Sequence, residues 1–471
     1  MKGSGSEYDK MKQYSLFFPI LFVIGLFFIL ISPHFLSDGM FLDGLWYATL
    51  SKNLAEGFGS FWVPRLTQTY NAWGQPPLAY LLESVFFHFG KSLYVAKIYS
   101  VFTCLCTGVL MFLTWKEVGG KRENFWMVLL LWVATPLVSW CAPENVLENT
   151  MVLFTLLSVL FYLRSLRKNH ILNVVLAGII LFLALLTKGF TGLYPLAFPV
   201  IHMLFVRKTT PPRALADTLI MLACVLLPVT ALYLFSPEAK LFMQNYLSEQ
   251  LLTSLKYIQT VNTRFDIVLQ FFTQALLPLA IVGVVVVVAW MQKTLHNPFR
   301  DTNRRLTWAL LALVLAGVLP IMISLKQRGF YIVTVFPLFA LAAGIAIEPL
   351  LENIRTSPVF TKISKGISVV VLIAAIALNI HFAGKAGRDE NLLADIRLAS
   401  SQVPEDTIMS ADKTLYTLWS MPAYFYFEKK ISLDFDSVRE WHLDGINAAP
   451  PDSSYLLCAK GSLLQLFRKQ D

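Results

Sequence analysis

The chain has 471 residues, of which 56% are hydrophobic and 15% are charged, and its mean hydropathy is +0.59. A soluble protein of this length normally carries about a quarter charged residues, so the composition excludes an ordinary soluble enzyme and indicates a membrane protein. The formal net charge of +9 does not indicate a nucleic-acid partner, because the basic residues gather in short loops between apolar runs, where a bias in membrane orientation explains them.

Apolar runs near the roughly 20-residue length of a membrane-spanning helix recur along the whole chain. The first run is longer than the apolar region of a secretory signal and lacks a small-residue cleavage site, so we expect it to remain as a helix. With breaks at charged and Pro/Gly clusters, we predict about eleven spans. They cover residues 14–35, 92–115, 125–141, 147–163, 171–187, 190–206, 214–235, 266–290, 306–325, 331–347 and 366–383.

The loops between these runs alternate in charge. Basic residues fall in every second loop, at residues 116–122, 164–168, 207–213, 293–305 and 355–365. Cytoplasmic loops carry an excess of Lys and Arg, so this pattern predicts a cytoplasmic N-terminus, and an odd number of spans then places the C-terminus outside. The long pieces 37–91, 236–265 and 384–471 would all lie on that outer side.

The first long loop, residues 37–91, contains two helical patterns. One runs over residues 43–56 and stops at Gly57, and the other runs over residues 78–89 and stops at Gly90. Both are amphipathic and rich in aromatic residues, a composition that favours helices lying in the membrane interface.

The tail, residues 384–471, is polar and differs in character from the rest of the chain. Its pattern predicts a helix near residues 391–401 and strands at residues 407–410, 423–427 and 454–458. We therefore expect an α-helical polytopic membrane module at residues 1–383, followed by a small outer α/β domain at residues 384–471.

Ionisable groups beside apolar spans are costly unless they are paired, hydrated or used in function. Four regions with such groups map to the predicted outer side of the bundle. They are Asp43 after the first span, Glu144 and Glu148 in a short turn, Lys188 at a span end, and the stretch with Lys326, Arg328 and Tyr331.

Two carboxylate regions beside two cationic regions suit the transfer of a sugar from a lipid phosphate. A carboxylate can accept the proton of an acceptor hydroxyl, and Lys or Arg can hold the phosphate and the charge that grows on it as the sugar leaves. Each residue alone also has a simpler role, since Asp43 could cap a helix and Lys188 could extend its amine to the interface. Only the joint pattern favours a site.

Asp43 and Glu148 are also a candidate site for a divalent metal ion, although no His accompanies them and the metal is unknown.

Several motifs occur in a recognisable order. They are Asp43-Gly-Leu-Trp-Tyr47-Ala, Val63-Pro-Arg-Leu66, Gln75-Pro-Pro-Leu78-Ala-Tyr80, Phe89-Gly90, Leu186-Thr-Lys-Gly189, and Lys326 with Tyr331 and Pro337. In this order they resemble the bacterial GT-C glycosyltransferases related to lipid A aminoarabinose transferase and protein O-mannosyltransferases. The resemblance implies the GT-C fold, a polyprenyl-phosphate (undecaprenyl-type) monosaccharide as donor, and a lipid, glycan or protein as acceptor. It also implies inversion at the sugar and a multi-pass protein of the bacterial inner membrane with a periplasmic active site.

The resemblance implies a role for each of these residues. Asp43 takes the position of the family's acidic catalytic residue, and Glu148 falls where many members have a second Asp. The donor phosphate would be bound by Lys188, Lys326, Arg328 and Tyr331, and the substrate pocket would include Tyr47, Arg65, Gln75 and Glu144.

The chain departs from the family pattern in three places. Gly44 replaces the second of two adjacent acids, Gln75 replaces a Lys before the paired prolines, and Glu148 replaces an Asp. A neutral Gln75 cannot supply the charge that Lys gives to a phosphate. Either Lys188, Lys326 or Arg328 takes over that role, or the donor head group differs.

Two other classes of function compete with sugar transfer. A transporter or flippase of lipid-linked sugars would also gather charges near a membrane face, but it would need polar residues deep within several spans. A non-catalytic scaffold that binds through its tail would leave the regions of Asp43 and Lys188 without a use.

Overall fold

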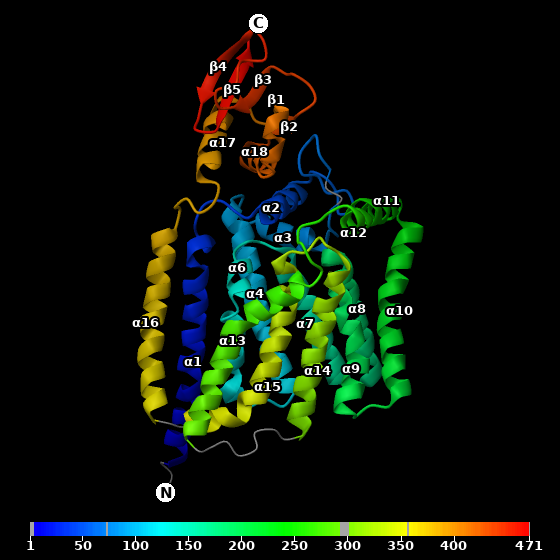
Figure 1. The fold of residues 1–471 in the computed structure, drawn as a ribbon, viewed down its shortest axis with the longest axis vertical. Coiled ribbons are helices and arrows are strands. Elements are labelled where there is room, and N and C mark those ends of the chain that lie inside the picture. Colours follow the sequence, from blue (N-terminus) through cyan, green and yellow to red (C-terminus); the bar gives the residue numbers. More distant parts are fainter. Residues whose placement is uncertain (1–3, 72–73, 293–300, 356–357, 471) are drawn as a thin grey trace.

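The computed structural model describes residues 4–71, 74–292, 301–355 and 358–470. It is a bundle of long helices with a small sheet-containing domain at one end (Figure 1). The predicted class, an α-helical membrane bundle with a small C-terminal α/β domain, is confirmed. Residues 293–300 and 356–357, which belong to two of the predicted basic loops, lie outside the described part.

The bundle consists of long apolar helices joined by short connections. They are α1 (Ser4–Phe35), α4 (Leu93–Glu117), α5 (Phe125–Val133), α6 (Pro136–Cys141), α7 (Leu147–Ser165), α8 (His170–Lys188), α9 (Phe198–Val206), α10 (Pro211–Phe235), α13 (Asp266–Met291), α14 (Asp301–Val318), α15 (Phe336–Arg355) and α16 (Pro358–Phe382). In the described residues, nine helical stretches are long and apolar enough to cross a membrane. The expected number of about eleven spans stays a prediction.

Three of the predicted spans differ from simple helices. The span predicted at 125–141 divides into α5 and α6, because Pro136 begins a new helix after a short break. The spans predicted at 171–187 and 190–206 form one apolar stretch, His170–Val206, that changes at Gly189 from α8 into the 3-10 segment η2 (Gly189–Ala197). Gly189 has φ +81°, a conformation that residues with a Cβ rarely adopt.

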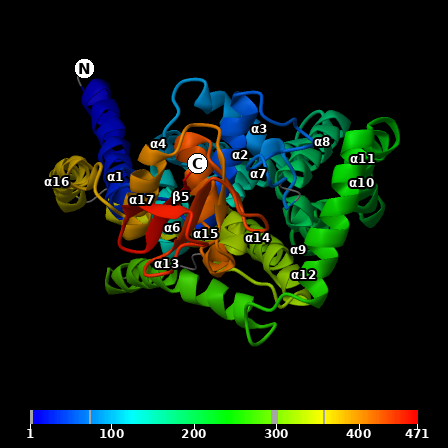
Figure 2. The same ribbon diagram turned by 90° about the horizontal axis from the view of Figure 1, so that it is seen from above.

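The two edges of the bundle are formed by different helices. The first helix, α1, packs along α16, whereas α10 lies at the opposite edge against α8 and α9 (Figures 1 and 2). The centre is filled by buried apolar side chains of α4, α5, α7, α14 and α15, among them Trp115 of α4 and Phe336 of α15. The cluster of charged residues described below lies where this core ends.

Short helices cover the end of the bundle that carries the C-terminal domain. They are α2 (Leu42–Ala55) and α3 (Leu78–Phe87) from the first loop, and α11 (Pro237–Asn245), η3 (Tyr246–Leu252) and α12 (Thr253–Lys256) from the second. The sequence predicted helices at 43–56 and 78–89, close to α2 and α3. The N-terminus lies at the opposite end of the bundle (Figure 1).

The helix α2 is enclosed between the bundle and the C-terminal domain. Its Leu45 and Leu50 belong to a buried apolar cluster that also contains Met421 and Phe425 of the tail. The packing therefore holds α2 from both sides, a more enclosed position than the open membrane interface suggested by its amphipathic pattern.

The C-terminal domain is a five-stranded sheet covered by two helices. The strands are β1 (Ile408–Ala411), β2 (Ser432–Asp434), β3 (Trp441–Gly445), β4 (Tyr455–Lys460) and β5 (Leu464–Lys469), in the order β2-β1-β3-β5-β4. The helices are α17 (Glu390–Gln402) and α18 (Met421–Lys429), and a 3-10 segment, η6 (Lys413–Thr417), follows β1. The strands β2 and β3 are parallel to β1, and β5 is antiparallel to both β3 and β4.

One predicted strand in this domain is wrong. Residues 423–427 belong to the helix α18 rather than to a strand. Pro422 stands in the first turn of this helix, where its missing N–H costs nothing, and residues 423–427 are all buried. An aromatic run that is buried on every side fits a packed helix as well as a strand, so hydrophobic pattern alone does not separate the two.

Candidate active site

A buried ion pair lies at the junction of α7 and α8. The Lys188 ammonium is 2.5 Å from Oε1 of Glu148, and both side chains are almost fully buried. The same ammonium lies over the rings of Phe330 and Tyr331, 5.2 and 5.1 Å from their centroids. Glu148 stands in the first turn of α7 and Lys188 is the last residue of α8, so both charges occupy helix ends where the macrodipole favours them.

Asp43 lies beside this pair but is not bound to it. It is the second residue of α2, and its carboxylate has no hydrogen-bond or ion-pair partner in the described part of the chain. Burial raises the pKa of the Asp43 carboxyl, while the charges of Lys188, Arg328 and Lys326, in that order, act to lower it. The helix α2 begins without a side-chain cap, so Asp43 does not serve as the cap that its position allowed.

The cations of the stretch before Tyr331 approach Asp43 from the connection between η4 (Leu319–Ile323) and η5 (Gly329–Val335). Lys326 donates to Oγ of Ser254 at 3.1 Å, and Arg328 is exposed. Burial lowers the pKa of Lys326, and the charge of Asp43 opposes this shift. One carboxylate, without a partner in the described residues, thus lies near three cations, one from the end of α8 and two from the connection between η4 and η5.

A cavity of about 640 Å³ opens beside these charges. Its polar lining includes Lys188, Lys326, Tyr331 and Gln75. Much of the remaining wall is apolar and comes from η2, α14 and η4; it includes Phe190, Leu193, Pro320, Ile321 and Ile323. Phe190 and Ile323 are 50% and 63% exposed, so the apolar wall continues to the outer surface of the bundle. A cavity with cations at one corner and an apolar wall suits an amphiphile with an anionic head group.

Tyr246 closes one side of this cavity and explains the glycine after Lys188. A Cβ at Gly189 would lie 2.0 Å from the Tyr246 hydroxyl. Any larger residue would displace either Tyr246 or the end of α8 that positions Lys188.

Two tyrosines of the first loop lie near Asp43, and a buried carboxyl group, that of Glu83, lies near one of them, Tyr80. The rings of Tyr47 and Tyr80 lie 5.7 Å apart, and both tyrosines are close enough to Asp43 for its charge to raise their pKa, although burial is the larger cause. Glu83 is buried and accepts from Asn145 at 2.9 Å. Burial raises the pKa of Glu83 to about 8.

The hydrogen bonds around Glu83 fit a neutral carboxyl. The Ser51 hydroxyl lies 2.8 Å from the carbonyl of Tyr47 and 2.9 Å from Oε2 of Glu83. A hydroxyl has one proton, so when Ser51 donates to Tyr47, a protonated Glu83 can donate to Ser51. Tyr80 and Glu83 were not predicted as site residues, although Tyr80 ends one of the first-loop motifs and Glu83 is a carboxylate on an apolar helix.

Two predicted pocket residues lie apart from this cluster. Glu144 is buried, accepts from the backbone N–H of Phe41 at 2.8 Å, and lies 3.5 Å from both His34 and Arg388. It joins α1, the start of α2 and the linker to the C-terminal domain. Arg65 is exposed and lies over the Phe58 ring at 5.6 Å.

The turn that contains Glu144 also explains Gly44. A Cβ at Gly44 would lie 2.0 Å from the carbonyl oxygen of Glu144, and Asn145 donates to the Gly44 carbonyl at 3.1 Å. The backbones of the two segments approach too closely for any side chain, so a second acid beside Asp43 does not fit here.

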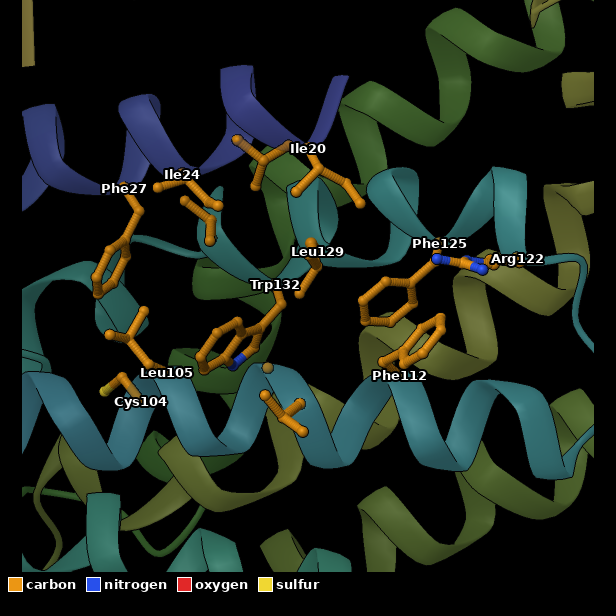
Figure 3. Close-up of a pocket in the computed structure, with 14 residues that line it drawn as sticks. Ile20, Ile24, Phe27, Cys104, Leu105, Phe112, Arg122, Phe125, Leu129 and Trp132 are labelled. Carbon is orange, nitrogen blue, oxygen red and sulfur yellow. The ribbon is translucent and has the colours of Figure 1, made fainter. Parts of the chain in front are cut away.

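A second, wholly different pocket lies between α1, α4 and α5 (Figure 3). It has a volume of about 440 Å³ and an almost entirely apolar wall that includes Phe27, Leu105 and Trp132. Among the described residues that line it, Arg122 is the charged one and none is a carboxylate. This pocket offers a place for an acyl chain but no acid–base chemistry.

Part of the chain matches a known protein family. Residues 74–240 match the dolichyl-phosphate-mannose-protein mannosyltransferase family. A search of curated proteins found no match.

Solved structures share the fold over nearly the whole chain. ArnT from Cupriavidus metallidurans bound to undecaprenyl phosphate aligns with a TM-score of 0.65 at 14% identity, over 94% of this chain and 96% of that chain. The apo state of ArnT aligns with a TM-score of 0.65 at 15% identity, over 95% and 97%. The oligosaccharyltransferase from Archaeoglobus fulgidus in complex with Zn and sulfate aligns with a TM-score of 0.50 at 11% identity, over 90% and 68%.

Identities this low establish a common fold rather than a common substrate. The resemblance drawn from the ordered motifs is confirmed by the family match and by the fold. Residues 74–240 are therefore similar to the dolichyl-phosphate-mannose-protein mannosyltransferase family, and the whole chain shares the GT-C fold of ArnT.

Proposed function

We propose that this protein transfers a monosaccharide from a polyprenyl-phosphate carrier to a lipid, glycan or protein acceptor. The observation that carries the proposal is the carboxylate of Asp43, without a partner in the described residues, close to the charges of Lys188, Lys326 and Arg328, of which the two lysines line a cavity with an apolar wall. The shared fold supports it, since ArnT has been solved with undecaprenyl phosphate bound.

The reaction needs one proton acceptor and a site for one anionic leaving group. Asp43 accepts the proton of the acceptor hydroxyl as its oxygen attacks the anomeric carbon. The bond between that carbon and the phosphate oxygen breaks, and the polyprenyl phosphate leaves with the bonding electrons. The cations Lys188, Lys326 and Arg328 stabilise the charge on the phosphate. Attack from the face opposite the phosphate inverts the anomeric centre.

Glu148 has a different task in this proposal from Asp43. Its Oε1 already contacts the Lys188 ammonium, so its negative charge is shared with that cation. We assign Glu148 the role of holding Lys188 toward the cavity, and Asp43 the role of base. The sequence had placed both among the catalytic residues.

The neutral Gln75 lines the same cavity as Lys188 and Lys326. These two lysines supply the positive charge that a Lys before the paired prolines would give. A phosphate in this cavity therefore does not depend on a charge at residue 75. Tyr331 lines the cavity as well and lies beneath the Lys188 ammonium.

A divalent metal ion fits this site poorly. Two carboxylates, Asp43 and Glu148, are available, and one of them is engaged by Lys188. The described residues contain no group of three or more His, Cys, Asp or Glu side chains arranged to hold a metal. The proposed steps therefore use this chain's own residues.

Charge placement favours a transferase over a transporter of lipid-linked sugars. Buried charges in the described spans lie near helix ends, as for Glu148 with Lys188 and for Asp217 with His170. A carrier needs polar groups at mid-depth along its path.

We further propose that the site faces the periplasm of a bacterial inner membrane. The support is the alternation of basic loops, together with the gathering of α2, α3, α11, α12 and the C-terminal domain at one end of the bundle (Figure 1). A phosphatase reporter fused after Gly384 is expected to be active only outside the cytoplasm, whereas a fusion after Lys208 should be inactive. Activity of the Lys208 fusion and silence of the Gly384 fusion would place the site on the wrong side.

The cations of the 326–328 stretch are expected to act on the donor. The double variant Lys326→Ala with Arg328→Ala should weaken donor use by roughly 1.5–3 kcal/mol, the scale of charge-assisted hydrogen bonds, and leave acceptor affinity unchanged. Steady-state kinetics at varied donor concentration measure this loss. Lys460→Ala, on an exposed strand of the C-terminal domain, is the matched control. Equal donor kinetics in the double variant and the control would show that Lys326 and Arg328 are ordinary loop charges.

A further inference from the structure

A groove separates the first loop from the C-terminal domain, and it shares no lining residue with the cavity described above. Its volume is about 510 Å³. One wall comes from Trp46 on α2 and from residues 66–70, and the other comes from η6, Trp419, Pro422 and residues 433–436. The proposed donor chemistry uses none of these residues.

Aromatic rings form the walls of this groove. Trp46 and Tyr70 lie 5.7 Å apart on one wall, and on the other wall Tyr416 lies 5.4 Å from both Trp419 and Phe435. Tyr70, Tyr416 and Trp419 are 50%, 56% and 54% exposed, although each lies in a polar region of the chain. The two walls meet where the indole N–H of Trp46 donates to the carbonyl of Trp419 at 3.2 Å. A hollow lined by exposed aromatic rings marks a binding site rather than a solvated surface.

Polar groups occur at the rim of the groove. Lys413 and Asp436 form an exposed ion pair at 3.3 Å, and the exposed Thr69 lines the opposite side, next to the buried Thr67 whose hydroxyl is hydrogen-bonded to that of Thr69. Asp434 also lines the groove, but its carboxylate is engaged by the Arg439 guanidinium at 2.7 Å. The groove thus combines flat apolar rings with hydrogen-bonding groups, the combination that a sugar needs for its C–H faces and its hydroxyls.

The groove reaches α2 one helical turn from the proposed base. Trp46 follows Asp43 by three residues on α2, and side chains three apart on a helix are neighbours, with about 5–6 Å between their Cβ atoms. A ligand stacked beside Trp46 therefore lies about one helical turn from Asp43.

A peptide strand is a poorer fit for the same groove. The strand β2 is at the edge of the sheet and borders the groove, so it could in principle accept an added strand. The first loop already occupies this edge, because Thr69 donates to the carbonyl of Leu433 at 3.0 Å and the N–H of Gln68 donates to Oγ of Ser432 at 3.1 Å.

We propose that this groove binds the saccharide part of the acceptor and presents its hydroxyl to Asp43. The inference rests on the proposed function and narrows the acceptor from a lipid, glycan or protein to a molecule that contains a sugar. The saccharide stacks on Tyr416, Trp419 and Tyr70, and its hydroxyls bond to the polar rim.

The test measures binding and transfer separately, with the purified full-length protein. The probe is the mixture of water-soluble saccharides released by mild acid from the envelope of a deletion strain, detected by saturation-transfer NMR. The wild type and Asp43→Asn should both bind saccharide, and Tyr416→Ala with Trp419→Ala should not. In the transfer assay the double variant should raise the acceptor KM at least about tenfold, the loss of one stacking contact, with the donor KM unchanged.

Two further variants separate stacking from folding. Tyr416→Phe keeps the ring and should keep binding, while Leu456→Ala, at an exposed residue of β4 outside the groove, should behave as the wild type. Thermal unfolding of each variant shows whether it is folded. If the double alanine variant is unfolded, the binding of saccharide by Tyr416→Phe is the result that tests the groove.

The outcomes distinguish the two proposals. Saccharide binding that depends on Tyr416 and Trp419, without cleavage of any sugar-phosphate donor, would overturn the proposed function and leave the groove as a sugar site. Transfer by a wild type that binds no released saccharide, or an acceptor KM untouched in the double variant, would overturn the groove assignment and leave the transferase.

Discussion

Asp43→Asn is expected to abolish most of the transfer activity while leaving insertion and folding unchanged. Asn has nearly the same size and keeps the start of α2 polar, but it cannot accept a proton. The loss in turnover should be at least about a hundredfold, the lower end of what general-base catalysis contributes. Turnover of the purified variant with donor and acceptor present measures the loss. Substantial activity in this variant would remove Asp43 from the mechanism.

The pH dependence of the wild type tests the same assignment. The base works in its deprotonated form, and burial raises the pKa of Asp43 above its ordinary value. Turnover should therefore fall as the pH is lowered through this raised pKa, and it should be fully present above it. The residual activity of Asp43→Asn should lack that acidic limb. A variant with the same limb as the wild type would show that another group titrates.

Glu148→Ala is expected to destabilise the protein more than the loss of any surface ion pair. It leaves the Lys188 ammonium buried without its counter-ion, a change that costs about 3–5 kcal/mol in comparable buried pairs. The double variant Glu148→Ala with Lys188→Met removes both charges and should recover much of the stability. Thermal unfolding in detergent measures both effects.

Glu117→Ala is the matched control for this prediction. Glu117 pairs with Arg164 and Arg167 at the other end of α7, where the side chains are partly exposed. Such partly exposed ion pairs contribute about 0–1 kcal/mol to the free energy of unfolding. Equal unfolding of Glu117→Ala and Glu148→Ala would mean that Glu148 and Lys188 are hydrated and that Glu148 does not hold Lys188. The Glu148→Ala with Lys188→Met variant should regain stability without regaining activity, because the cation beside the donor phosphate is gone.

Local patterns predicted the bundle and the first-loop helices well. A long apolar run in a membrane forms a helix, because the backbone N–H and C=O groups of each span must form hydrogen bonds within it. The first-loop helices were predicted from the glycines that follow them, and α2 and α3 end close to those glycines. The helix α18 was predicted as a strand because its aromatic residues are buried on all sides, a feature set by the sheet and by α2 rather than by its own sequence.

Some residues of the candidate site could be predicted from the sequence alone, and others could not. Asp43, Lys188 and Lys326 stand out in sequence because charges beside apolar spans need an explanation. Which carboxylate pairs with Lys188 depends on how α7 meets α8, so the different positions of Glu148 and Glu144 appear only in the fold. The close approach of Gly44 to the Glu144 backbone, and the neutral state that burial favours for Glu83, likewise depend on contacts between segments far apart in the chain.

Cleavage of the donor by the purified protein tests the central claim most directly. The protein is reconstituted into liposomes with a polyprenyl-phosphate monosaccharide that is labelled in its sugar, together with membranes of a deletion strain as the acceptor source. A transferase moves the label to the acceptor and releases one polyprenyl phosphate for each sugar transferred, and Asp43→Asn does neither. Movement of the intact labelled carrier across the bilayer, with its sugar-phosphate bond unbroken, would contradict the account and identify a transporter.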